Sequence, residues 1–101
     1  MTKRYRIRYL RTAQKDLLEI FEYILEDKPV AALDQLERFD QSISHLASNP
    51  LLGAVPNDER LRRLGYRVLV VDKYLVFYVL KGRVLQIRRI LHGARKYDFL
   101  L

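Results

Sequence analysis

The chain has 101 residues, no cysteine and a net charge of +7, and half of its residues are hydrophobic. This length suits one compact domain over residues 1–101, whose core needs neither disulfides nor thiolate metal ligands. The lack of cysteine fits a reducing compartment, and no apolar run reaches the ~18 residues needed to cross a bilayer. We therefore expect a cytoplasmic protein that makes no contact with membranes.

Charge is distributed unevenly along the chain. Residues 16–40 carry eight acidic side chains, whereas residues 1–15 carry six basic side chains and no acid. Residues 60–97 carry eleven basic side chains and one acid, Asp72. This asymmetry predicts a polyanionic target, an acidic protein partner, or both. The alternative is a solvated surface with a chance excess of arginine.

The first half of the chain predicts one strand and two helices. Residues 4–10 alternate between basic and apolar side chains, which is the period of a strand with one buried face. Thr12 is expected to cap a first helix, and Pro29 suits the first turn of a second, which Asn49-Pro50 ends. Their apolar stripes are Leu17, Ile20, Phe21, Ile24 and Leu25, then Leu33, Leu36, Phe39, Ile43 and Leu46. The two helices should lie antiparallel, with both stripes facing a common core.

The second half predicts three strands after an irregular loop over residues 51–60. The strands span residues 66–71, 74–80 and 83–91, and their connectors, Asp72-Lys73 and Lys81-Gly82, have the length of hairpin turns. Residues 74–80 are apolar at both parities, so this strand should be interior and covered on both faces. The whole order predicts an α+β fold in which a helical hairpin packs on an antiparallel four-stranded sheet, with acids on the helices and basic residues on the sheet.

Three segments carry recognisable patterns. Residues 64–78 combine an arginine-bearing strand with a Tyr-x-Val-x-Tyr strand, and residues 89–95 read Arg-Ile-Leu-His-Gly-Ala-Arg. Asn49-Pro50 is followed by Gly53 after the second helix. Together these segments resemble the RelE/ParE superfamily of toxins from type II toxin–antitoxin modules. The likeness spans nearly the whole chain and implies the β-α-α-β-β-β order of that fold.

The resemblance implies a partner as well as an activity. Toxins of this superfamily are neutralised by a cognate antitoxin, whose largely disordered and often acidic segment wraps the toxin in a complex that can be of higher order. The implied role is plasmid stabilisation or growth arrest, without cofactor or metal. A disordered acidic segment suits a large basic surface. We therefore expect the helical pair to leave a cationic hollow that such a segment fills.

Two activities are known in the superfamily. ParE-like members bind and poison an essential protein such as DNA gyrase, whereas RelE-like members are metal-independent mRNA interferases that cleave mRNA on the ribosome. RNA cleavage needs a base for the 2′-hydroxyl, cations for the phosphorane and an acid for the leaving oxygen. If the chain is such an endoribonuclease, its candidate catalytic residues are His92, Arg95, Arg67 and Tyr97.

Each candidate also has a plain structural interpretation. Arg67 has the chemistry to hold a phosphate or is an exposed strand arginine, and His92 either moves a proton or has a structural or partner-contact role. Arg95, Lys96 and Tyr97 suit phosphate contact and base stacking, or anchor the C-terminal segment to the core. The residues expected to contact the target or the antitoxin are Arg67, Arg89, His92, Arg95, Lys96 and Tyr97.

Three departures bear on the choice of activity. RelE-like nucleases usually have an arginine where Leu75 stands, a C-terminal tyrosine where Phe99 stands and lysines where residues 68–70 are aliphatic. The leucine, phenylalanine and aliphatic side chains that this chain has at those positions can neither move a proton nor stabilise an oxyanion. The sequence therefore favours a ParE-like toxin that acts by binding. A ribonuclease based on His92 and Arg95 is the alternative, and a member that binds antitoxin without poisoning anything is a third.

Overall fold

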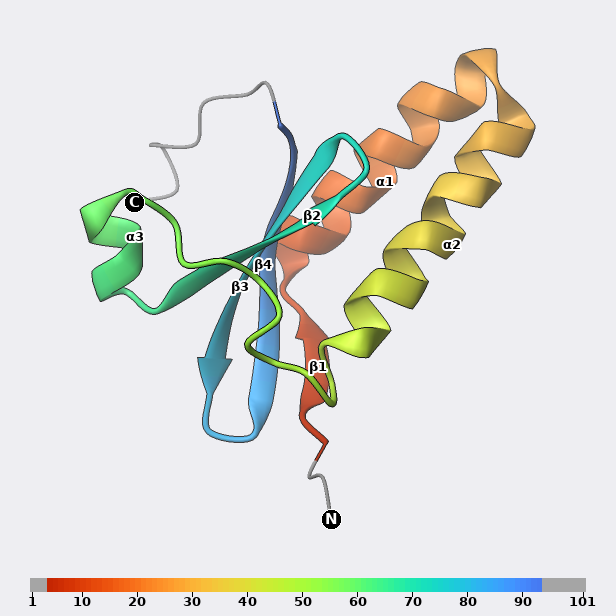
Figure 1. Ribbon diagram of the computed structural model, residues 1–101. Helices are drawn as coiled ribbons and strands as arrows, with labels where there is room; N and C mark the ends of the chain where they lie inside the picture. Colours follow the sequence, from red (N-terminus) through yellow and green to blue (C-terminus); the bar gives the residue numbers. More distant parts are fainter. Residues whose placement is uncertain (1–3, 94–101) are drawn as a thin grey trace.

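The computed structural model describes residues 4–93, which form a four-stranded sheet with a helical hairpin on one side and a short helix on the other (Figure 1). The elements are β1 (Arg6–Tyr9), α1 (Arg11–Asp27), α2 (Pro29–His45), α3 (Glu59–Arg63), β2 (Tyr66–Val71), β3 (Tyr74–Lys81) and β4 (Val84–His92). The α+β fold and its six predicted elements are confirmed. The added helix α3 falls partly within the predicted loop, because its five residues are too few for a periodic apolar stripe.

The sheet is mixed, which corrects the expectation of a purely antiparallel one. Its strand order is β1-β4-β3-β2, and β1 runs parallel to β4 while the other pairs are antiparallel. The helical hairpin returns the chain to the end where β1 began, as the bond from the Tyr5 amide to the Ala47 carbonyl shows (2.7 Å). Strand β2 therefore runs in the direction of β1, and after two reversals β4 does so as well.

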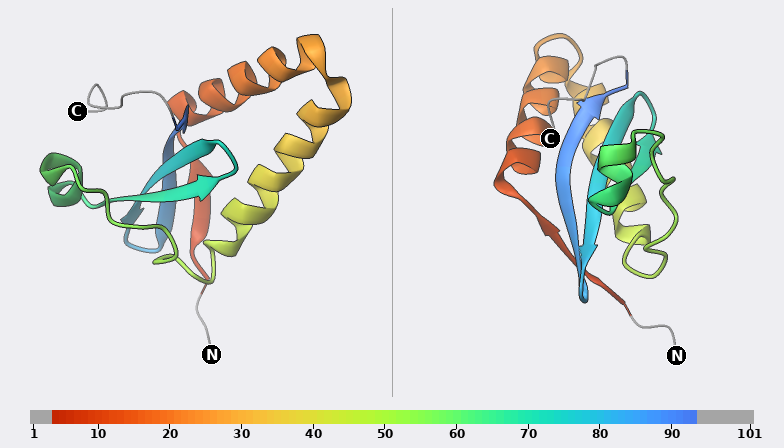
Figure 2. Two further views of the ribbon diagram at one scale, coloured as in Figure 1. Left: turned by 45° about the horizontal axis from the view of Figure 1, so that its top comes forward. Right: turned by 90° about the vertical axis from the view of Figure 1, so that its left-hand side faces the viewer.

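Strand β3 lies inside the sheet and is covered on both faces, as predicted. On the hairpin side, Val76 and Tyr78 belong to a core that includes Phe39 and Ile43 of α2. On the opposite side, Phe77 and Val79 pack with Leu61 of α3 in a second core. Figure 2 shows the sheet standing between α3 and the hairpin.

Strand β1 has the predicted alternation. Tyr5, Ile7 and Tyr9 pack against the hairpin-side core, whereas Arg6 and Arg8 are exposed. Arg6 and Arg8 lie beside Val84 and Gln86 of β4, so they belong to the side of the sheet that faces away from the hairpin.

The hairpin is only half buried, which corrects the expectation that both apolar stripes face the core throughout. Phe39 and Ile43 are fully buried near the sheet, but Leu25 and Leu33 are 41% and 62% exposed. The far half of the hairpin extends past the end of the sheet, where nothing in the described chain covers it (Figure 1). Neither this pair of helices nor α3 is both long and apolar enough to cross a membrane.

The start of α1 also differs from the prediction, because Thr12 is not its cap. The helix begins at Arg11 directly after β1, and Leu10 in the cap position makes no side-chain hydrogen bond. The Thr12 hydroxyl instead donates to the Arg88 carbonyl of β4 (3.0 Å), and the Leu10 amide donates to the Ile87 carbonyl (2.9 Å). Both bonds join the start of the helix to β4.

A buried carboxylate ties α1 to β4 more firmly. Asp16 is 7% exposed, and its carboxylate accepts two hydrogen bonds from the Arg89 guanidinium, at 2.7 and 2.9 Å, and a third from the Ile90 amide at 3.0 Å. The hydrogen bond to Asp16 raises the pKa of the Arg89 guanidinium above its usual value. This effect is larger than the opposing effect of burial, which lowers the pKa. The buried negative charge of Asp16 is tolerated because the Arg89 guanidinium and the Ile90 amide both donate hydrogen bonds to it.

Replacing Asp16 with asparagine should lower the free energy of unfolding by about 3 kcal/mol, because it leaves the Arg89 cation partly buried without its counter-charge. Urea denaturation measures this value. The matched control is Glu22→Gln on the exposed side of α1, which should change stability by less than about 0.5 kcal/mol. Equal unfolding midpoints for the Asp16→Asn protein and the unaltered protein would contradict the structural role given to this pair.

Candidate functional site

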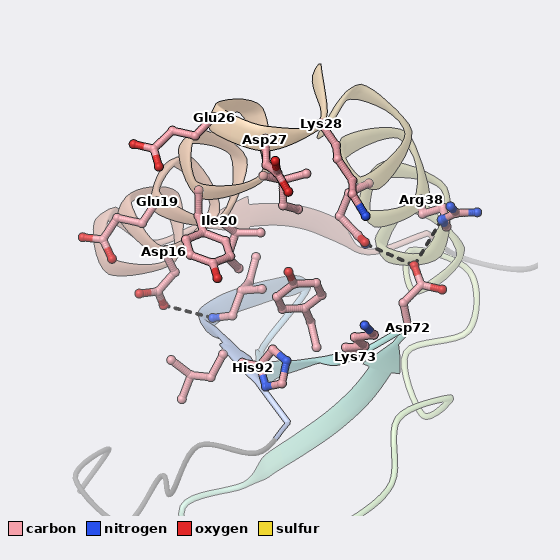
Figure 3. Close-up of a pocket in the computed structure, with 16 residues that line it drawn as sticks. Asp16, Glu19, Ile20, Glu26, Asp27, Lys28, Arg38, Asp72, Lys73 and His92 are labelled. Carbon is pink, nitrogen blue, oxygen red and sulfur yellow. Dashed lines mark hydrogen bonds and ion pairs between the residues drawn. The ribbon is translucent and has the colours of Figure 1, made fainter. Parts of the chain in front are cut away.

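An open hollow lies between the far half of the helical hairpin and the end of the sheet (Figure 3). Its volume is about 1090 Å³. The α1 wall presents carboxylates, the α2 side presents Gln35 and Arg38, and the opposite wall consists of the β2–β3 turn and the last residues of β4. The hollow exists because the hairpin is longer than the sheet that supports it.

The hollow is not the cationic one that the sequence led us to expect. Five carboxylates line it against three cations, apart from His92. The carboxylates are Asp16, Glu19, Glu26, Asp27 and Asp72, and the cations are Lys28, Arg38 and Lys73. The face of α1 that carries Ile20 and Ile24 also carries most of these acids. Where α1 extends past the end of the sheet, this face is not covered by the sheet and lines the hollow. Within residues 4–93, no group of acidic and histidine side chains is arranged to hold a metal ion.

His92 lies on the wall opposite α1, at the end of β4 (Figure 3). Its ring meets the Tyr74 ring edge to face, with centroids 5.6 Å apart and an interplanar angle of 83°. Burial raises the pKa of Tyr74, with smaller contributions from Tyr23 and Asp72, so the Tyr74 phenol is neutral near pH 7. The chain after His92 is fixed by the Gly93 amide, which donates to the Lys73 carbonyl (2.8 Å).

Arg67 is committed to the loop that follows α2. Its Nη1 donates to the Gly53 carbonyl at 2.7 Å and to the Leu51 carbonyl at 3.3 Å. The neighbouring Tyr78 hydroxyl donates to the Pro50 carbonyl (2.7 Å) and accepts from the Gly53 amide (2.9 Å). A Cβ at position 53 would lie 2.7 Å from the Tyr78 ring, so only glycine permits this approach. The Asn49-Pro50 motif and its glycine thus serve to anchor this loop.

The structure does not bring Arg67 and His92 together. Arg67 pairs with Tyr78 and His92 pairs with Tyr74, so four residues of β3 separate them along the sheet. At about 3.3 Å per residue this separation is ~13 Å. A phosphate held by Arg67 would therefore be out of reach of the His92 imidazole.

The cationic surface lies on the other side of the sheet, and we call it the basic face. It comprises Arg6 and Arg8 of β1, Arg88 of β4, and Arg60, Arg62 and Arg63 of the neighbouring helix α3. The Arg88 guanidinium lies 5.6 Å from the centre of the Tyr66 ring, which places it on this side with the α3 core. Strands β1 to β4 contain no acidic residue, so the predicted placement of the acids on the helices is confirmed. The basic residues are not confined to the sheet, because the helices carry them too, at Arg11, Lys15, Arg38, Arg60, Arg62 and Arg63.

The remaining predicted site residues are placed as follows. Arg89 is bound to Asp16, so its guanidinium has a structural contact on the hairpin side. Arg95, Lys96, Tyr97 and Phe99 lie outside the described residues. Sequence reasoning missed Asp16 and Tyr78. Asp16 could have been found because it falls between Ala13 and Ile20 on the buried stripe of α1.

Replacing Tyr78 with phenylalanine should loosen the loop at residues 50–53. The change leaves the Pro50 carbonyl and the Gly53 amide without their partner and should cost about 2 kcal/mol of stability. Burial raises the pKa of the Tyr78 hydroxyl although the Gly53 bond and Arg67 oppose it, so the hydroxyl is a donor at neutral pH. Hydrogen exchange at the Gly53 amide should accelerate, and the exposed Tyr23→Phe is the control. Unchanged exchange at Gly53 would show that the hydroxyl does not hold the loop.

Solved structures of similar fold are toxins of toxin–antitoxin pairs. The chromosomal ParDE system of P. aeruginosa aligns with a TM-score of 0.73 at 23% identity, covering 87% of this chain and 95% of that one. The RelBE2 complex of Mycobacterium tuberculosis gives 0.61 at 21% identity, covering 88% and 98%. YafQ of E. coli strain BL21(DE3) gives 0.55 at 20% identity, covering 89% and 94%.

Sequence comparison identifies the family. No curated protein sequence matches the chain. The family model described as the ParE toxin of the type II toxin–antitoxin system parDE matches residues 7–97, which include every described strand and helix except the first residue of β1. This match covers most of the chain, and the ParDE and RelBE2 structures share its arrangement of hairpin and sheet. The chain therefore belongs to the ParE toxin family of type II toxin–antitoxin systems.

Proposed function

We propose that the chain is a ParE-like toxin that acts in the cytoplasm by binding and poisoning an essential protein such as DNA gyrase, and that a cognate antitoxin neutralises it. One observation favours binding of a target protein over cleavage of mRNA. Arg67 is occupied by two loop carbonyls and lies ~13 Å along the sheet from His92. In the described part of the chain, the candidate cation and the candidate base for RNA cleavage therefore do not converge on one phosphate.

The basic face supplies the surface for such binding. Arg6 and Arg8 are exposed on an edge strand, and no carboxylate on the four strands competes for them. Clustered positive charge accelerates association with a negatively charged surface and orients it. Together with Arg95, Lys96 and Tyr97, which we propose contact the target or the antitoxin, this face favours an acidic or DNA-bound protein.

An apolar groove supports the antitoxin as partner. It has a volume of about 400 Å³ between α1 and α2, and its walls include Leu17, Leu18, Phe21 and Leu36. Leu18 is 57% exposed, and the nearby Leu33 is 62% exposed. Uncovered apolar surface of this kind is typical of a face that a partner covers. An amphipathic segment of the antitoxin would bury it.

The second candidate function is a metal-independent mRNA endoribonuclease. Its support is the position of His92, an exposed imidazole beside Lys73 and Tyr74 in an open hollow. Arg95 follows three residues later in the chain. In this alternative, His92 and Arg95 would act on the phosphate without Arg67.

Two assays on the purified chain separate these functions. We expect it to inhibit plasmid supercoiling by DNA gyrase and to leave mRNA uncut on ribosomes, as scored by primer extension. His92→Ala should retain the inhibition. Codon-positioned cuts that disappear in His92→Ala, together with unimpaired supercoiling, would overturn the proposal in favour of the ribonuclease.

A charge-reversal pair tests the basic face. Arg6→Glu combined with Arg8→Glu should raise the concentration needed for half-inhibition of gyrase by about tenfold, equivalent to ~1.4 kcal/mol. The matched control reverses the same number of charges on α1, with Arg11→Glu and Lys15→Glu, both exposed. Equal inhibition by the two double variants would show that the basic face is not the contact surface.

A further inference from the structure

The side of α1 that faces away from the sheet carries a row of exposed side chains, which we call the outer stripe. It lies opposite the buried residues Ala13 and Asp16 on the helix. Its members recur at helical spacing and are all exposed: Arg11, Lys15, Leu18, Glu22, Leu25 and Glu26. Leu18 and Leu25 are 57% and 41% exposed. Within residues 4–93, none of the four charged members forms an ion pair.

The order of charge along the outer stripe is unfavourable for α1 on its own. The basic pair, Arg11 and Lys15, lies toward the start of the helix, and the acidic pair, Glu22 and Glu26, lies toward its end. The helix dipole favours the reverse order, with acids near the start and bases near the end. The members of each pair are also four residues apart, so like charges are neighbours on the helix surface. The stability of the monomer therefore does not account for this arrangement.

The same order is complementary to itself when two copies of α1 lie antiparallel. Positions 11 and 26, and positions 15 and 22, are centred on the same point, between positions 18 and 19. A twofold axis at this point sets Lys15 of each copy opposite Glu22 of the other, and Arg11 opposite Glu26. Leu18 then lies beside the axis, and the two helix dipoles run in opposite directions. A parallel pair of helices would instead bring like charges together.

We propose that the isolated chain associates with a second copy of itself through the outer stripe, as an antiparallel pair of α1 helices. Four ion pairs then flank a centre in which Leu18 packs against Leu18 of the second copy. Leu25 covers the aliphatic part of Arg11 from the second copy. A second copy is the occupant because neither a uniformly acidic nor a uniformly basic partner complements both halves of the stripe.

This association is weak, because the ion pairs are exposed and one pair of helices buries less surface than a standard interface. We expect a Kd on the order of 100 μM, so below about 1 μM the chain is a monomer that is free to bind a target. Leu18 also lines the apolar groove between α1 and α2. A partner segment that fills this groove covers Leu18 and therefore competes with the second copy. Self-association itself does not depend on the proposed function.

Sedimentation equilibrium of the purified chain at low salt measures the association. The mean mass should rise from that of the monomer toward that of the dimer between about 10 μM and about 1 mM. Glu22→Lys with Glu26→Lys makes the outer stripe entirely basic, and Arg11→Glu with Lys15→Glu makes it entirely acidic. Each double variant alone should stay monomeric, and an equimolar mixture of the two should recover the dimer. Each variant shifts the net charge of +7 by four, so both remain positive and net charge does not attract them.

A matched control makes the same charge change on α2. Asp34→Lys with Glu37→Lys, both exposed and outside the outer stripe, should leave the Kd within about twofold of the unaltered value. If a charge-reversed variant fails to fold, the neutral variant Glu22→Gln with Glu26→Gln should still weaken the association by about threefold or more. The inference is overturned if the unaltered chain stays monomeric over this range. It is also overturned if the mixture of folded variants stays monomeric, or if the stripe and control variants associate equally.

Discussion

The Asp16 carboxylate ties the helical hairpin to β4, and the shape of the hairpin side of the molecule depends on this contact. Three donors from β4 converge on this group: two guanidinium nitrogens of Arg89 and the Ile90 amide. Because Asp16 lies in the second turn of α1, the contact sets where the helix crosses the sheet and how far its remaining turns extend beyond it. The hollow, its acidic wall and the exposed far half of the hairpin are consequences of that placement.

The molecule separates its charges between layers, and this separation suits a protein that works by contact. The hairpin holds eight of the acids, whereas the four strands hold none, so a chain of net charge +7 still has an acidic region. The basic face around Arg6 and Arg8 and the acidic wall of the hollow near Glu26 lie on opposite sides of the sheet. One small domain thus offers different surfaces to partners of different charge.

Much of the fold could be predicted because its signals are local. Alternation at residues 4–10 specifies a strand with one buried face, and the doubly apolar run at 74–80 specifies an interior strand covered on both faces. The direction of β1 could not be read locally, because it depends on where the hairpin returns the chain. The predicted positive charge of the hollow was wrong for a related reason. The distribution of charge along the chain does not reveal which face of a helix stays open. Arg67 looks available for a phosphate in the sequence, and nothing there indicates that the loop carbonyls of Leu51 and Gly53 occupy it.

The central claim is that Asp16 and Arg89 act as one unit that docks α1 on β4, and a double-mutant cycle tests it most directly. Unfolding free energies would be measured for Asp16→Ala, for Arg89→Ala and for the double variant. The account predicts a coupling energy of about 2 kcal/mol or more, because either single change already removes the shared contact. Additive effects within ~0.5 kcal/mol would contradict it, since the hairpin would then be held by apolar packing without this pair.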